Sequence, residues 1–135
     1  MRVIAGAAAL AALAAAGCGT PSADLFAVTR SGTIPGARLS MVVGDGGTVT
    51  CNGAKAVGLT DPQLLQAREL QRELTKPARR HLVLAPRPQS ILRYRVRTPD
   101  GSVTFADNSA GAGAALARLT LFVREVAQRQ CRLAR

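Results

Sequence analysis

The sequence predicts an α+β domain, a twisted antiparallel sheet of about four to five strands with two helices packed on one face. Two observations carry this prediction. Short runs of alternating apolar and polar residues are separated by glycine-rich turns, and two longer segments repeat apolar residues at helical spacing. The chain has 135 residues, enough for one domain with a modest core. We expect that domain to span residues 24–135.

The clearest strand pair is a hairpin of alternating residues. From Leu92 to Arg97 apolar side chains alternate with arginines, and the alternation resumes at Val103. The turn-forming sequence Thr98-Pro99-Asp100-Gly101 separates the two runs. Because successive side chains of a strand point to opposite faces, the arginines of this hairpin would all face away from the core.

The loop length sets the register of this hairpin. A two-residue Asp100-Gly101 turn would bring Pro99 into the ladder, where a residue without an N–H cannot donate. A four-residue loop avoids this and keeps the apolar residues of both strands on one face. It pairs Val96 with Val103, and Tyr94 with Phe105.

Similar alternation predicts earlier strands at residues 25–30, 38–43 and 48–51, the last two joined by a turn at Gly44-Asp45-Gly46-Gly47. Residues 78–84 are a candidate for one more short strand.

The first helix is predicted from Thr60 to about Thr75. Thr60 and Gln63 fit a capping box, proline is tolerated in the first turn, and Lys76-Pro77 is expected to end the helix. Its apolar stripe consists of Leu64, Ala67, Leu70 and Leu74.

A closing helix is predicted after the Ala/Gly-rich loop at residues 110–115. One face of this helix carries Leu116, Leu119, Phe122, Val123, Val126 and Ala127. Cys131 falls at the edge of that face, so the last turn of the helix can meet the core near Cys51.

The first seventeen residues have the pattern of a secretory signal peptide. Arg2 precedes an uninterrupted small and apolar run over residues 3–16, which is short for a membrane span. Ala15-Ala16-Gly17-Cys18 resembles a bacterial lipobox, although leucine would be usual where Ala15 stands. Cleavage after Ala16 by ordinary signal peptidase is the alternative. With lipid on Cys18, residues 18–23 would be a short tether, and the domain would sit at the outer face of the cytoplasmic membrane.

The number of cysteines favours lipidation. The chain has three, an awkward number in an oxidising compartment, and modification of Cys18 leaves Cys51 and Cys131 as a pair. We therefore predict a disulfide between Cys51 and Cys131.

The composition is strongly basic. Lys and Arg total 18 against 8 Asp and Glu, and removal of Arg2 with the signal leaves 17 against 8, a net charge of +9. Such a charge attracts anionic lipid or cell-wall polymer. A compositional origin is the alternative, because arginine far outnumbers lysine. Nucleic acid is not expected outside the membrane, and apart from Tyr94, which is predicted on the core face, no aromatic residues are interleaved with the basic ones for stacking.

The residues that usually carry catalysis form no recognisable pattern. His81 is the single histidine and stands beside two arginines, and the sequence has no zinc-type Cys/His spacing and no phosphate-binding glycine loop. We expect no enzyme activity, no cofactor and no metal site.

Arg93, Arg95 and Arg97 are the best candidates for anion binding. At two-residue spacing their side chains stand about 7 Å apart on one strand face. The alternative is an ordinary polar outer face of a one-sided sheet.

Val28-Thr29-Arg30-Ser31-Gly32 closes the first predicted strand, and Arg93-Tyr94-Arg95-Val96 precedes Asp100-Gly101. Together with the mid-chain and closing helices, these motifs resemble the emfourin family of small inhibitors of thermolysin-like metalloproteases. The similarity covers roughly residues 24–128. The chain departs from the family at Thr33-Ile34-Pro35-Gly36, where a second glycine and an aromatic residue are usual. The resemblance implies a non-enzymatic binding module, with protease inhibition as its expected role.

The loop after the first strand is the predicted partner-binding site of such a module. Its candidate residues are Arg30, Ser31, Gly32, Ile34 and Pro35. Two glycines and a proline would hold Ile34 in a short rigid loop, where it can enter a pocket of a partner. Alternatively, Ile34 folds back over the sheet edge. A surface protein that holds anionic lipid or wall polymer through its arginines is the alternative function.

Overall fold

A computed structural model describes residues 23–133 of the chain. The predicted signal peptide and Cys18 lie outside the described residues. Within 23–133 the fold is α+β, a six-stranded antiparallel sheet with two helices, and the strand order is β4-β3-β2-β1-β5-β6. The elements are β1 (Asp24–Gly32), β2 (Leu39–Gly44), β3 (Thr48–Cys51), β4 (Val57–Gly58), α1 (Asp61–Arg79), β5 (Leu92–Thr98), β6 (Gly101–Ala106) and α2 (Gly113–Arg129).

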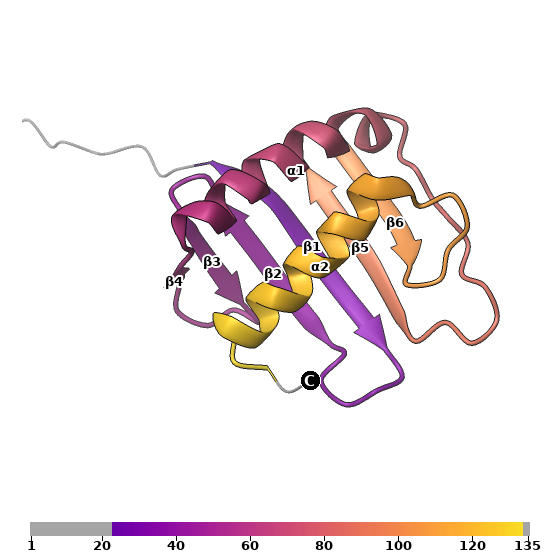
Figure 1. The fold of residues 1–135 in the computed structure, drawn as a ribbon, viewed down its shortest axis with the longest axis horizontal. Helices are drawn as coiled ribbons and strands as arrows, with labels where there is room; N and C mark the ends of the chain where they lie inside the picture. Colours follow the sequence, from indigo (N-terminus) through magenta and orange to yellow (C-terminus); the bar gives the residue numbers. More distant parts are fainter. Residues whose placement is uncertain (1–22, 134–135) are drawn as a thin grey trace, which may run out of the picture.

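Strand β1 lies inside the sheet and joins its two halves (Figure 1). Val28 pairs with Met41 of β2 on one side and with Val96 of β5 on the other. All three side chains are buried. Because side chains alternate along each strand, this register collects the apolar residues of β2, β1 and β5 on one face.

The predicted register of the β5–β6 hairpin is confirmed. Val96 pairs with Val103 and Tyr94 with Phe105, and the two rings stack with centroids 5.0 Å apart. The ladder reaches one pair further than predicted, to Thr98 and Gly101. The turn therefore has two residues, Pro99 and Asp100, and the proline stays out of the ladder.

The expected number of strands, four to five, was too low for the part of the chain that the structure describes. The additional strand is β4, whose two residues pair with Thr48 and Val49 at the edge of the sheet. A two-residue strand is too short to show any alternation. Residues 78–84 are not a strand, because the first two belong to α1 and Val83 makes only an isolated parallel bridge to Thr104.

Helix α1 begins as predicted but ends later. Thr60 Oγ1 accepts from Gln63 N at 3.3 Å and Gln63 Oε1 accepts from Thr60 N at 2.9 Å, which is the capping box. The helix then continues past Thr75 through Pro77 to Arg79. Its last turn is held by packing, since Ala78 is fully buried. The carbonyl of Ala78 lies so close to Gly101 that a Cβ atom on residue 101 would overlap this carbonyl.

Both helices cover the same face of the sheet (Figure 1). The predicted apolar face of α2 is confirmed, and all six of its residues are buried. Phe122 of α2 meets Phe26 of β1 edge to face, with ring centroids 6.0 Å apart. This contact places α2 directly over the central strand, and an edge-to-face pair adds to the stabilisation from burial alone.

Two links fix the end of α2. The sulfurs of Cys51 and Cys131 lie at bonding distance, as predicted, with their Cα atoms 5.7 Å apart. Beside them the side-chain amides of Gln63 and Gln130 bond to each other, at 2.7 and 3.2 Å. The first link ties the segment after α2 to β3, and the second ties it to the start of α1.

We expect removal of the disulfide to destabilise the fold without changing it. The bridge joins residues 80 apart in the sequence, and a closed loop of that size contributes about 4 to 5 kcal/mol by the chain-entropy model. Urea unfolding of the wild type and of the double variant Cys51→Ser/Cys131→Ser measures the difference. A loss below about 1 kcal/mol, or two free thiols by intact-mass spectrometry of the wild type, would contradict it.

Candidate functional site

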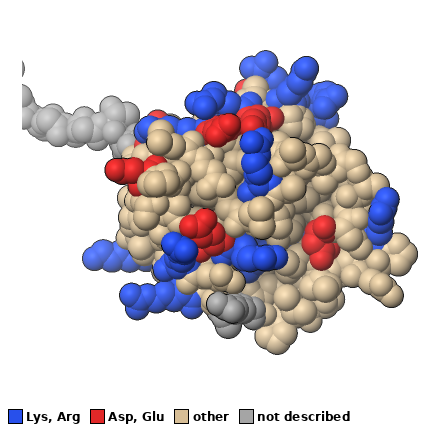
Figure 2. Space-filling view, in the orientation of Figure 1, with Lys and Arg blue, Asp and Glu red and all other residues tan. Residues whose placement is uncertain are grey.

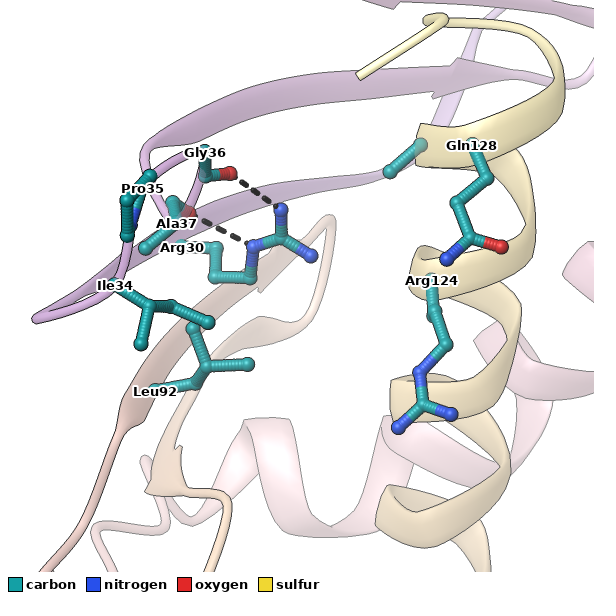
Figure 3. A pocket seen from close by; sticks show the side chains of 9 residues that line it. Arg30, Ile34, Pro35, Gly36, Ala37, Leu92, Arg124 and Gln128 are labelled. Carbon is teal, nitrogen blue, oxygen red and sulfur yellow. Dashed lines mark hydrogen bonds between the residues drawn. The ribbon is translucent and has the colours of Figure 1, made fainter. Parts of the chain in front are cut away.

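A cleft of about 490 Å³ lies between the β1–β2 loop and the last turns of α2 (Figure 3). Its volume falls in the range of small-ligand sites. The loop side of the cleft overlaps the predicted partner-binding segment. The cleft is lined by Arg30, Ile34, Pro35, Gly36, Ala37, Leu92, Arg124, Ala127 and Gln128.

Arg30 shapes the loop from inside. It occupies a core-facing position of β1 and is only 8% exposed. Its Nε donates to the carbonyl of Ala37 at 2.8 Å, and its Nη2 donates to the carbonyl of Gly36 at 3.0 Å. A buried charge is costly unless it is hydrogen-bonded, so these two bonds offset the burial of the guanidinium and hold the loop around it.

Ile34 projects at the outer edge of the same loop. It is 45% exposed and lies beside Leu92 at the mouth of the cleft (Figure 3). Ile34 is therefore not folded back completely over the sheet edge, and nearly half of its surface is open to solvent. Pro35 next to it is exposed. The loop therefore presents a small apolar edge.

The other two predicted residues, Ser31 and Gly32, belong to strand β1 and do not line the cleft. Gly32 ends β1 where the backbone of β5 passes closely, and a Cβ at this position would overlap the carbonyl of Ile91. Thr33 N donates to that same carbonyl at 3.2 Å. Ser31 is exposed and lies opposite Arg93, on the sheet face that the helices leave open. Of the five predicted residues, the structure brings Arg30, Ile34 and Pro35 together at the cleft.

The sequence did not predict the helical wall of the cleft, which is formed by Arg124 and Gln128 of α2. Arg124 and Gln128 are both exposed and four residues apart, so they share one face of α2. They flank the buried stripe on the side that faces the β1–β2 loop (Figure 3). Their spacing is visible in the sequence, but the loop that they face is not.

The cleft carries positive charge without a partner. Across residues 23–133 the salt bridges are Arg68–Asp45, Arg79–Asp100, Arg118–Glu73 and Arg129–Glu125. None involves Arg30 or Arg124. Figure 2 shows that basic and acidic groups are mixed elsewhere on the helix side of the molecule.

Tyr94 lies near these arginines. Burial raises the pKa of the Tyr94 hydroxyl above its ordinary value of 10.0, while the nearby Arg30 guanidinium partly opposes the shift. Asp107 also raises the pKa and Arg124 lowers it. The phenol thus reports on the charges around the cleft.

A second basic surface occupies the open face of the sheet. Arg93, Arg95 and Arg97 are exposed along β5, as predicted. On β1 their cross-strand neighbours are Ser31, Thr29 and Ala27, and on β6 they are Ala106, Thr104 and Ser102. No neighbour in either strand is acidic. We call Arg93, Arg95 and Arg97 the arginine row.

Among residues 23–133 no three His, Cys, Asp or Glu side chains are grouped to hold a metal ion. His81, which follows α1, is exposed. None of the described helices is long and apolar enough to cross a membrane.

No protein-family model, curated protein or solved structure matches the chain.

Because the chain has a single tyrosine, its absorbance at 295 nm reports Tyr94 alone. We expect this hydroxyl to titrate above 10.0 in the folded protein. Arg30→Met and Arg124→Met should raise the pKa further, and Asp107→Asn should lower it. A folded-state pKa above the unfolded value means that the stabilising contribution is complete below pH about 10 and is lost as the pH rises through the folded pKa.

The stability measurement has its own control. The unfolding free energy of the wild type should fall with rising pH in this alkaline range, and Tyr94→Phe should remove that part of the slope. A spectrophotometric pKa at or below 10.0, or no response to Arg30→Met, would contradict the placement of Tyr94.

Proposed function

We propose that this chain is an exported, membrane-tethered binding domain without enzyme activity, which engages a protein partner through the β1–β2 loop and the adjoining cleft. The observation that carries the proposal is the placement of Ile34. It is 45% exposed beside a cleft, in a loop whose carbonyls are fixed from within by Arg30.

The physical advantage of such a loop is its low entropy cost. A segment that is already held in its bound shape loses little conformational freedom on association, so a small contact area can still give useful affinity. Hydrogen bonds from Arg30 and the ring of Pro35 both restrict the loop. An apolar tip on a rigid loop is therefore a suitable anchor for a pocket on a partner.

The position of the loop suits a tethered protein. The tether would enter at the start of β1, whereas the loop follows the other end of that nine-residue strand, roughly 30 Å away. Figure 1 shows these two ends of β1 on opposite sides of the domain. If Cys18 carries lipid, the loop and cleft point away from the membrane toward the periplasm or the wall.

The emfourin-like motifs suggest the class of partner, a thermolysin-like metalloprotease. The first of these motifs contains Arg30 and ends at Gly32, directly before the loop. This proximity supports the loop as the contact surface for a protease.

We expect the wild-type protein to inhibit a thermolysin-like protease and Ile34→Asp to weaken inhibition by about tenfold or more, because the apolar anchor is replaced by a charge that must be desolvated. Val83→Asp is the matched control, since Val83 is also an exposed apolar residue but sits beside β6. Inhibition constants are measured for variants whose circular dichroism matches that of the wild type.

Two results would count against the proposal. Absence of inhibition by the wild type would remove the protease as partner. Equal inhibition by Ile34→Asp and the wild type would move the contact to another surface.

A second function is favoured by the arginine row. Its three guanidinium groups stand about 7 Å apart, and within the described residues none takes part in a salt bridge. The serine and threonine neighbours add donors without adding negative charge. We propose as the alternative that this face holds anionic lipid or cell-wall polymer.

Binding of anionic lipid by the arginine row is tested with protein that lacks the predicted lipid anchor. Cys18→Ser should release the protein from the membrane fraction, and this form is used for sedimentation with vesicles that contain anionic lipid. In this background, Arg93→Gln/Arg95→Gln/Arg97→Gln should lower binding and flatten its salt dependence, at about 1 kcal/mol per arginine.

The control variant removes the same charge elsewhere. Arg72→Gln/Lys76→Gln/Arg80→Gln changes three exposed groups on or next to α1. If both triple variants lose binding equally, net charge and not the arginine row is responsible. If neither loses binding, the row is an ordinary solvent-facing surface.

A further inference from the structure

The two sides of the cleft offer different chemistry. Arg30 reaches in from β1 and points across the opening toward α2, which contributes Arg124 and Gln128 (Figure 3). The remaining lining is apolar or backbone, from Ile34, Pro35, Gly36, Ala37, Leu92 and Ala127. A ligand that fits must combine a negative group with an apolar one at short distance.

We propose that the cleft binds the C-terminal carboxylate of a polypeptide whose last side chain is apolar. This inference rests on the proposed function, because it names the part of a protein partner that enters the cleft.

The state of Arg30 argues for a carboxylate. A guanidinium has five N–H donors in a fixed plane, and the loop carbonyls of Ala37 and Gly36 use two of them. These bonds also prevent the group from turning away. The Tyr94 hydroxyl takes up a further donor, and the donors that are left are held at the cleft. Planar guanidinium groups bind carboxylates with paired, charge-assisted hydrogen bonds. Because neither Arg30 nor Arg124 is in a salt bridge within residues 23–133, an incoming carboxylate displaces no resident acid.

The apolar wall argues for a chain end. A C-terminal residue carries its carboxylate and its side chain on the same carbon atom, so one residue can meet the arginines and the wall formed by Ile34 and Leu92 together. Gln128 offers an amide that can pair with the preceding peptide group. A volume of about 490 Å³ suits a few terminal residues and is too small for a folded surface.

Other anions satisfy the cleft less completely. Inorganic phosphate would use the arginines and leave the apolar wall exposed to water. A short fatty acid would use the arginines and the wall but has no peptide group for Gln128. The experiment therefore compares these three sources of negative charge directly.

The probe is a fluorescein-labelled peptide, Ala-Ala-Val-Leu, with a free C-terminus, titrated with the full-length protein in detergent micelles and followed by anisotropy. We expect saturable binding of this peptide. The C-terminal amide of the same peptide should bind with an affinity lower by about tenfold or more, since the amide carries no charge for the arginines. Butanoate and inorganic phosphate should compete more weakly than unlabelled peptide acid.

Two variants on one helix give the matched comparison. Arg124→Met should weaken the peptide acid by about three- to tenfold and leave the weak affinity of the amide unchanged. Arg129→Met removes the same charge five residues further along the helix, from a residue that pairs with Glu125 and does not line the cleft, and should change neither. Arg30→Lys keeps the charge but loses the planar fork, so it should also weaken the peptide acid.

Three results would overturn the inference: equal binding of peptide acid and amide, equal effects of Arg124→Met and Arg129→Met, or tighter binding of butanoate or phosphate than of peptide acid. The proposed function fails separately. If Ile34→Asp loses protease inhibition but the wild type does not bind the peptide acid, the carboxylate site is rejected and the β1–β2 loop remains the contact with the protease. If the wild type binds the peptide through its carboxylate but does not inhibit the protease, the protease is rejected as the partner and the cleft remains a carboxylate-binding site.

Discussion

The alternation of side chains along β1 constrains both the core and the cleft. Its core-facing row runs Phe26, Val28 and Arg30, so the same period that supplies two apolar core residues also directs a guanidinium inward. The charge lies at the end of the row, where the sheet stops and loop carbonyls are within reach. Its burial is offset there by hydrogen bonds, and the shape of the β1–β2 loop follows from them.

The opposite wall of the cleft depends on contacts at the far end of α2. The Cys51–Cys131 pair and the Gln63–Gln130 amides hold the last turn of this helix against β3 and the start of α1. Phe122 sets its height above β1 through the contact with Phe26. Arg124 and Gln128 lie on the last two turns of the same helix, so these contacts also fix their position. The separation of the two walls is therefore fixed by core contacts.

The fold also separates two kinds of charged surface. Acidic residues occur on both helices and pair with some of their basic neighbours, as with Glu73 and Arg118. The open face of the sheet has the arginine row and neutral neighbours. The row extends along β5 from Arg93, opposite Ser31 near the loop, to Arg97, opposite Ala27 near the start of β1. It lies on the open face of the sheet, whereas the cleft lies between the β1–β2 loop and α2. The two proposed functions therefore use different surfaces and do not exclude each other.

Periodicity and capping in the sequence determined the α+β class, the β5–β6 register, the start of α1 and the buried face of α2. These features depend on neighbours within a few residues, and cysteine parity added the pairing of Cys51 with Cys131. Tertiary contacts decided what the local pattern could not. Strand β4 is too short for any period, and α1 passes Pro77 because Ala78 packs against Gly101. The sequence placed Arg30 and Ile34 close together, but Arg124 is 94 residues after Arg30, and only the packing of α2 over β1 brings it to the same cleft.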